Sequence, residues 1–196
     1  MRHGPVSPTP WPAALGAALA LALVPAAAQA AAFTGRVVRV IDGDTLVVRD
    51  DAAVRRETRI AGIDAPEIRQ PYGVRARSRL VEIAYAKRVR VVWYKRDAYG
   101  RRVGRVFVES GSPCTRPPCA PPLDAGWAQI VAGYAWHDRE HATEQALDER
   151  MRYALAERAA RSRGDGLWAD AHPMPPWRYR HLHPRRLPPR PRWRHG

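Results

Sequence analysis

Five short stretches of the chain alternate hydrophobic and polar residues, which is the pattern of half-buried β-strands. A turn rich in Asp and Gly, Asp-Ala-Tyr-Gly, joins the last two stretches into a pair. Such short strands have edges that must be hidden from other chains, and a small closed barrel hides them. The stretches are residues 33–41 (FTGRVVRVI), 45–50 (TLVVRD), 55–63 (RRETRIAGI), 88–96 (RVRVVWYKR) and 102–109 (RVGRVFVE).

Helical periodicity replaces alternation in three other segments. Residues 72–87 place Ala76, Leu80, Ile83 and Ala84 on one face. Residues 123–136 predict a short helix, and residues 141–163 predict a long amphipathic one that Gly164 and Gly166 end. One helix after the third strand and two at the end predict an α+β fold. We expect a five-stranded oligonucleotide-binding (OB) barrel with three helices.

The two ends of the chain differ from this folded region. Residues 1–30 carry Arg2 and His3, then an apolar run that ends in Ala28-Gln29-Ala30, as a secretory signal peptide does. A retained membrane anchor is the alternative, but the run is short and Pro25 breaks it. Residues 171–196 are dominated by Pro, Arg, His and Trp, and we expect a basic, disordered tail. The sequence thus predicts a single domain over residues 31–170 in a protein that is secreted or periplasmic.

The chain is strongly basic, with a formal net charge of +14. Among its 33 basic residues only Lys87 and Lys95 are lysines. A GC-rich genome would favour arginine codons, whereas a functional explanation is that guanidinium groups bind phosphate oxygens in pairs. With either origin, the surface should attract polyanions with an affinity that falls as salt rises.

The two cysteines, Cys114 and Cys119, lie close together in the proline-rich stretch SPCTRPPCAPP. Export would make a disulfide stable, and the spacing suits one that closes a small surface loop. A metal site has too few ligands here, because no histidine lies nearby.

Two pairs of acidic residues stand out against the basic background. Asp42 and Asp44 flank Gly43 between the first two strands, while Asp64 and Glu67 follow the third strand. Asp42 is interpreted mainly as a turn residue. The two acidic turns lie at one end of the sheet or at opposite ends, and spacing alone leaves this open. If they converge, an oxygen-rich site would suit Ca²⁺; it is not an EF-hand, because Leu46 and Val47 replace a ligand and the glycine.

Three motifs resemble the thermonuclease family, the relatives of staphylococcal nuclease. They are VIDGDTLVV, TRIAGIDAPE and DAYGR, in that order, and GYAW and GLWAD resemble the family's C-terminal helices. The resemblance covers about residues 33–170. It implies an OB barrel with three helices and a Ca²⁺-dependent phosphodiesterase that acts on DNA and RNA and leaves 3′-phosphate ends.

The resemblance also implies roles for single residues. Asp44 and Asp64 match calcium-ligating aspartates, and Ala65 replaces a threonine that binds calcium through its carbonyl oxygen. Glu67 matches the glutamate proposed to orient or deprotonate water. The other matched positions are the phosphate-binding arginines, Arg59 and Arg101, and a tyrosine near the nucleotide, Tyr99.

The chain departs from the family pattern in several places. The loop after Glu67 is short, the cysteine stretch is an insertion, and the late aromatics Tyr134 and Trp136 do not match cleanly. The alternatives to an enzyme are a catalytically inactive barrel that binds nucleic acid or another polyanion, and a cell-envelope scaffold. Because the acids and arginines of the site are all present, we favour the enzyme, and expect a monomer with no stable protein partner.

Overall fold

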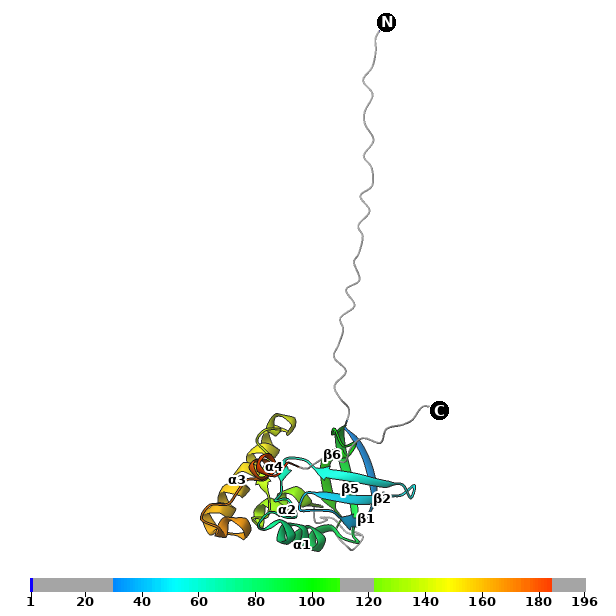
Figure 1. Cartoon of the computed structure of the whole chain (residues 1–196). Helices are drawn as coiled ribbons and strands as arrows, with labels where there is room; N and C mark the ends of the chain where they lie inside the picture. The colour runs from blue at the N-terminus through cyan, green and yellow to red at the C-terminus, as the bar shows by residue number, and fades with distance from the viewer. Residues whose placement is uncertain (2–29, 110–121, 185–196) are drawn as a thin grey trace, which may run out of the picture.

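Strands of the chain close into a barrel, and the helices gather on one side of it (Figure 1). The computed structural model describes residue 1, residues 30–109 and residues 122–184. Within these residues the barrel strands are β1 (Ala31–Val40), β2 (Thr45–Asp50), β3 (Arg55–Ile60), β5 (Arg88–Arg96) and β6 (Arg102–Val108).

Closure of the barrel depends on one parallel pairing. The strands follow the order β3-β2-β1-β5-β6, with antiparallel neighbours, and β3 then pairs with β6 in parallel. The long strand β1 joins the two halves: residues Ala31–Arg36 pair with β5, and residues Gly35–Val40 pair with β2. A two-residue strand, β7 (Leu123–Asp124), extends the sheet beyond β6. The predicted α+β fold with a five-stranded OB barrel is confirmed.

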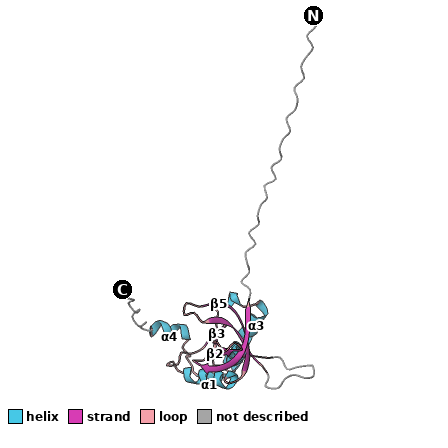
Figure 2. Cartoon of the chain, turned by 90° about the vertical axis from the view of Figure 1, so that its right-hand side faces the viewer, coloured by secondary structure: helices cyan, strands magenta, loops and turns pink. Residues whose placement is uncertain are grey.

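The core lies inside the barrel and continues beneath the helices. Valines and isoleucines of the strands form one cluster with residues of three helices. These are α1 (Gly73–Ala84), α2 (Ala125–Val131) and α3 (Leu147–Arg163). The predicted face of α1 is confirmed, because its buried residues include Ala76, Leu80, Ile83 and Ala84. In the view of Figure 2, α1 lies below β2 and β3.

Several elements are shorter than their hydrophobic pattern predicts. The third strand ends at Ile60, because Gly62 turns the chain with a φ of 74°. Residues after this turn form β4 (Ile63–Asp64), which pairs with β8 (Trp136–His137). The helix expected over 123–136 is therefore shorter: α2 covers Ala125–Val131, and Trp136 belongs to β8.

The long helix starts later than expected but stops where predicted. A short 3₁₀ turn, η1 (Ala142–Glu144), precedes α3. Gln145, which lies between η1 and α3, has an extended backbone, and its buried side chain bonds to His137 and Glu149. Gly164 ends α3 in the left-handed conformation, with a φ of 69°.

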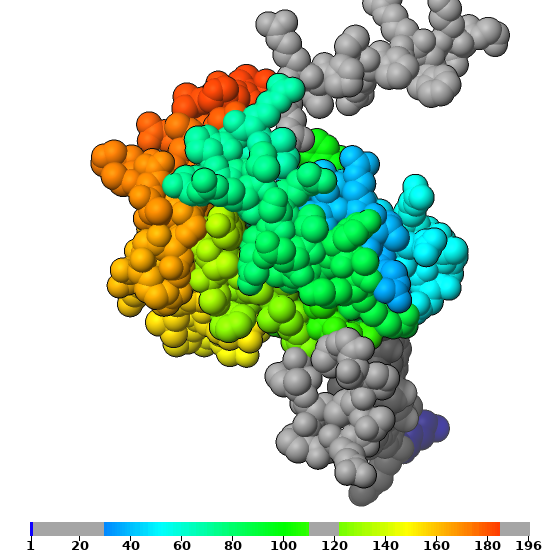
Figure 3. Space-filling model, turned by 90° about the horizontal axis from the view of Figure 1, so that it is seen from below, coloured from blue at the N-terminus to red at the C-terminus, as the bar shows by residue number. Residues whose placement is uncertain are grey.

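The segment after residue 170 is the main correction to the predicted organisation. A further helix, α4 (Pro176–Leu182), lies inside the predicted disordered tail, after the short turn η2 (Gly166–Ala169) at the end of the predicted domain. Pro176 is suited to a helix start, and Trp177 packs edge-on against Trp136 with ring centroids 5.4 Å apart. The Gln70 side chain donates to the Met174 carbonyl over 2.6 Å, and Figure 3 shows the red end of the described chain beside teal residues of the region before α1.

Several predictions fall outside the described residues. They concern most of the signal peptide (residues 2–29), the Cys114–Cys119 disulfide in residues 110–121, and the end of the tail (residues 185–196). Among the described helices, none is both long and apolar enough to cross a bilayer.

Candidate active site

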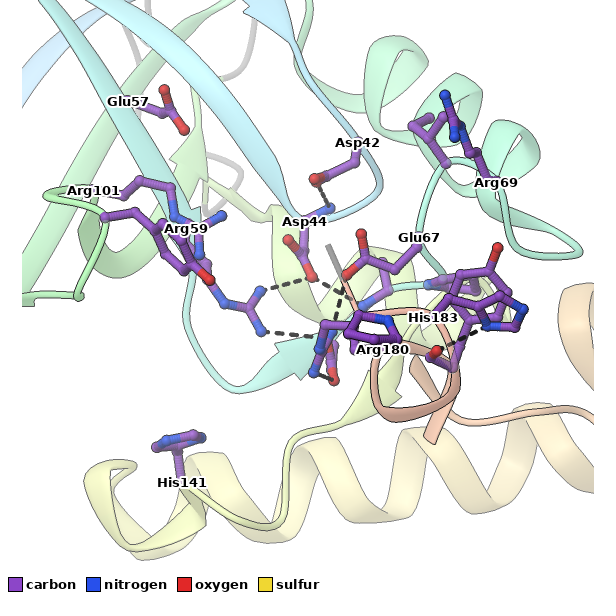
Figure 4. A pocket seen from close by; sticks show the side chains of 17 residues that line it. Asp42, Asp44, Glu57, Arg59, Glu67, Arg69, Arg101, His141, Arg180 and His183 are labelled. Carbon is purple, nitrogen blue, oxygen red and sulfur yellow. Dashed lines mark hydrogen bonds and ion pairs between the residues drawn. The ribbon is translucent and has the colours of Figure 1, made fainter. Parts of the chain in front are cut away.

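Both acidic turns open into one cleft at the same end of the barrel, which answers the question that spacing left open. The cleft has a volume of about 1060 Å³ (Figure 4). It is lined by every residue predicted for catalysis, metal binding or substrate contact: Asp44, Arg59, Asp64, Ala65, Glu67, Tyr99 and Arg101. The antiparallel register of β2 and β3 produces this convergence, because Thr45 pairs with Arg59.

The first acidic turn packs too tightly for any residue but glycine at its centre. A Cβ on Gly43 would lie 2.6 Å from the Ala65 Cβ and 2.7 Å from the Ala76 Cβ. Asp42 shapes the turn, since its Oδ1 accepts a hydrogen bond from the Asp44 N–H over 3.1 Å. Burial and the neighbouring Asp44 raise the pKa of Asp42 to about 7. The packing around Gly43 and the hydrogen bond from the Asp44 N–H to Asp42 together fix the backbone at Asp44.

The Arg59 guanidinium contacts both Asp44 and Asp64. Arg59 Nη1 lies 2.7 Å from Asp44 Oδ2, and Nη2 lies 3.4 Å from Asp64 Oδ1. Both carboxylates are buried, at 6% and 4% exposure. Burial acts to raise the pKa of Asp44, but Arg59 and the Ala65 N–H outweigh it and lower that pKa. Burial raises the pKa of Asp64 despite its two arginine partners.

The backbone of the second acidic turn is hydrogen-bonded to Asp44 of the first acidic turn. The Ala65 N–H donates to Asp44 Oδ2 over 3.0 Å, so β4 and the first turn are tied together. Glu67 lies two residues further on, and its side chain is 17% exposed. A turn fixes its backbone, because the Glu67 N–H donates to the Gln70 side chain and the Gln70 N–H donates to the Glu67 carbonyl.

Arg101 reaches the cleft from the hairpin between β5 and β6. Its Nε donates to Asp97 Oδ2 over 2.6 Å, and Nη1 lies 3.4 Å from the Thr45 hydroxyl beside Asp44. The exposed Tyr99 ring lies 5.2 Å from the Arg101 guanidinium carbon. The pairing with Asp97 orients Arg101 and leaves Tyr99 accessible at the rim.

The donor set suits a hard cation. Asp44, Asp64 and the Ala65 carbonyl supply only oxygen atoms, and two of the three come from buried carboxylates. No group of three or more His, Cys, Asp or Glu side chains in the described part of the chain is arranged to hold a metal. Positive charge nevertheless already lies at these oxygens, because the guanidinium groups of Arg59 and Arg180 contact Asp64. Asp44, Asp64 and the Ala65 carbonyl could therefore hold a divalent metal ion only together with additional water ligands.

One wall of the cleft comes from residues that the sequence analysis did not select. Helix α4 and the residue that follows it contribute Tyr179, Arg180 and His183 to the lining. The signal for them was the proline-led start of α4 and its basic and aromatic residues. Neither Tyr134 nor Trp136 lines the cleft; Trp136 packs against Trp168, with ring centroids 4.4 Å apart.

Comparison with known proteins gives the family. A family model described as staphylococcal nuclease homologue matches residues 57–170, more than half of the chain. The chain belongs to the staphylococcal nuclease family. The resemblance found from the motifs is thereby confirmed, although Asp42 and Asp44 lie before the matched residues.

Relatives from enteric bacteria match most of the chain. An uncharacterized endonuclease of Escherichia coli O157:H7 is 35% identical over 147 residues, which cover 75% of this chain and 84% of that protein. Protein ParB of Escherichia coli is 41% identical over 170 residues, or 86% and 91% of the two chains. A micrococcal nuclease of Shigella flexneri is 36% identical over 166 residues, or 83% and 89%. These matches confirm that the chain is a hydrolase of the thermonuclease type.

Proposed function

We propose that this staphylococcal nuclease homologue is an exported, Ca²⁺-dependent nuclease that cuts DNA and RNA and leaves 3′-phosphate ends. The observation that carries the proposal is the meeting of two buried aspartates, one glutamate and two arginines around a single cleft. A phosphodiester has an electrophilic phosphorus and one negative charge shared by two non-bridging oxygens. Arginines can bind these oxygens, and an acidic side chain can accept the proton of the attacking water.

The arginines are the groups that we propose to bind the phosphate. The side chain of Arg59 is 18% exposed and that of Arg101 is 22% exposed. Water therefore screens their charges less than it screens the charge of a fully exposed arginine. Guanidinium forks donate two parallel hydrogen bonds to phosphoryl oxygens. As water attacks phosphorus, negative charge grows on these oxygens, and fixed guanidinium groups stabilise it.

Glu67 is the group that we propose to accept the proton. Its carboxylate lies on the turn next to Asp64 and lines the same cleft. In the proposed step Glu67 accepts a proton from the attacking water, whose oxygen bonds to phosphorus. The bond between phosphorus and the 5′ oxygen breaks, and the 5′ oxygen takes up a proton from solvent water. When bound by Asp44, Asp64 and the Ala65 carbonyl, Ca²⁺ would add Lewis-acid stabilisation of the phosphoryl charge.

The experiment that tests this proposal is cleavage of single-stranded DNA and of RNA by residues 31–196, with Ca²⁺ and with a chelator. Glu67→Gln removes the proton acceptor, and Glu82→Gln on the exposed face of α1 is the matched control. We expect Ca²⁺-dependent cutting that Glu67→Gln reduces by about 10²-fold or more and that Glu82→Gln leaves unchanged. Intact DNA that the protein retains with and without Ca²⁺ would instead identify a binding barrel, the alternative function.

A further inference from the structure

Helix α4 is anchored against the nuclease domain at several points. Pro176 is buried, and Trp177 packs on Trp136. The carbonyl of Met174, just before the helix, accepts a hydrogen bond from the buried Gln70. Gln70 also accepts from the Glu67 N–H, so the anchor of α4 belongs to the same turn as the candidate base.

From this anchor α4 directs Arg180 onto the acidic residues of the cleft (Figure 4). Arg180 Nη2 lies 2.8 Å from Asp64 Oδ2, and Nη1 lies 3.0 Å from Asp64 Oδ1. The same Nη1 lies 3.2 Å from Glu67 Oε1. One guanidinium therefore engages both oxygens of the candidate metal ligand and one oxygen of the candidate base.

A guanidinium in this place competes with a metal ion for the same atoms. A divalent cation bound by Asp64 needs at least one of the two oxygens that Arg180 now holds. The cation would also lie a few ångströms from a fixed positive charge, in a site where burial weakens screening. The hydrogen bond from Arg180 also occupies one carboxylate oxygen of Glu67, the candidate base.

We infer that α4 is an autoinhibitory strap, in which Arg180 occupies the acidic residues of the active site until a divalent cation displaces it. The inference rests on the proposed metal-dependent function. Cation binding then has two effects: it fills the site, and it ends the contact between Arg180 and Glu67. The apparent cation affinity of the whole chain is lowered by the strap.

Calorimetric titration of the full mature chain with Ca²⁺, in the absence of nucleic acid, tests the strap without using activity. Arg180→Gln removes the competing charge. Arg178→Gln is the matched control, because Arg178 is exposed on the same helix and does not line the cleft. We expect Arg180→Gln to bind Ca²⁺ about tenfold more tightly and Arg178→Gln to stay within about twofold of the unmodified chain. Arg180→Lys keeps the positive charge, so its Ca²⁺ affinity should be closer to that of the unmodified chain than the affinity of Arg180→Gln is.

Hydrogen exchange of residues 176–182 supplies a second measurement. Saturating Ca²⁺ should speed amide exchange in α4 of the unmodified chain, because the helix loses its contacts with Asp64 and Glu67. The same addition should leave α4 of Arg180→Gln unchanged. A urea unfolding midpoint close to that of the unmodified chain shows that the variant is folded.

The outcomes separate the strap from the proposed function. Equal or weaker Ca²⁺ affinity in Arg180→Gln, or slower α4 exchange with Ca²⁺, overturns the strap while Ca²⁺ dependence stands. No Ca²⁺ binding by any variant at millimolar concentration overturns both the Ca²⁺ dependence and the strap.

Discussion

Gln129 of α2 donates a hydrogen bond over 2.7 Å to the carbonyl of Gly43, at the centre of the turn that presents Asp44. The same Nε2 donates to the Ala76 carbonyl of α1 over 2.9 Å. Gly43, Ala76 and Gln129 are all buried, so water does not replace this donor if it is lost. One side chain thus connects two helices to the acidic turn of the cleft.

We expect Gln129→Met to destabilise the fold and to loosen the site. Methionine keeps the length of the side chain but cannot donate, which leaves two buried carbonyl acceptors without this partner. The free energy of unfolding should fall by about 1–3 kcal/mol, measured by urea denaturation. Cleavage by the remaining folded protein should also fall, since Asp44 is no longer held. An unfolding free energy equal to that of the unmodified chain would contradict this role.

Gly43→Ala should push the two acidic turns apart. The new Cβ would lie within 2.7 Å of the Cβ atoms of Ala65 and Ala76, which is closer than such atoms approach. We expect a loss of about 1–3 kcal/mol in unfolding free energy, together with weaker Ca²⁺ binding. Adding Ala65→Gly removes one of the two clashes, so the double variant should lose less than the sum of the single losses. If the loss in the double variant equals the sum of the two single losses, the turn relieves the Gly43→Ala clash by moving away from Ala65 rather than by pressing on it.

Arg59→Lys should impair cleavage much more than stability. Lysine keeps the charge but not the planar fork that contacts Asp44 and Asp64 and that would bind a phosphate in pairs. We expect the rate of cleavage to fall by about 10²-fold. Arg56→Lys is the control, because Arg56 lies on the same strand and pairs with Asp50 away from the cleft. Equal rates for the two variants would exclude a phosphate-binding role for Arg59.

Local patterns explain which parts of this structure could be predicted. The buried face of α1 follows from the spacing of Ala76 and Leu80 within one helix, and Gly164 ends α3 through its own backbone. The convergence of Asp44 with Asp64 depends on the pairing of β2 with β3, which no local spacing contains. Arg180 lies 116 residues from Asp64 along the chain, and only the docking of α4 brings them together.

Acid should remove the contribution of the Asp51–Arg88 ion pair. The hydrogen bonds from Arg88 and Thr34 lower the pKa of Asp51 from its ordinary value of 3.8. A lowered folded-state pKa contributes stability above the unfolded-state value, and this contribution is lost as pH falls through the folded-state value. Asp51→Asn should therefore be slightly less stable than the unmodified chain at pH 7 and equally stable near pH 2, by urea denaturation. Because both side chains are about half exposed, 1 M salt should also reduce the difference. A difference that is independent of pH would contradict this account.

Asp124 connects the barrel to α2 and α3, outside the cleft. Its Oδ1 caps α2 by accepting from the Gly126 and Trp127 N–H groups, and also accepts from the Tyr153 hydroxyl over 2.9 Å. Its Oδ2 lies 2.9 Å from an Arg105 nitrogen and 3.0 Å from an Arg152 nitrogen.

Asp124→Asn should be the most destabilising of these substitutions. The amide can preserve the contacts of Oδ1, but its NH₂ group then faces two guanidinium donors in a buried position. We expect a loss of about 3–5 kcal/mol in unfolding free energy, as when one partner of a buried ion pair is removed. Asp148→Asn, at an exposed position in the first turn of α3, should lose only about 0.3–1 kcal/mol. Cleavage per folded molecule should stay constant in both variants, because neither residue lines the cleft. Equal losses for Asp124→Asn and Asp148→Asn would show that the barrel and the helices stay joined without this carboxylate.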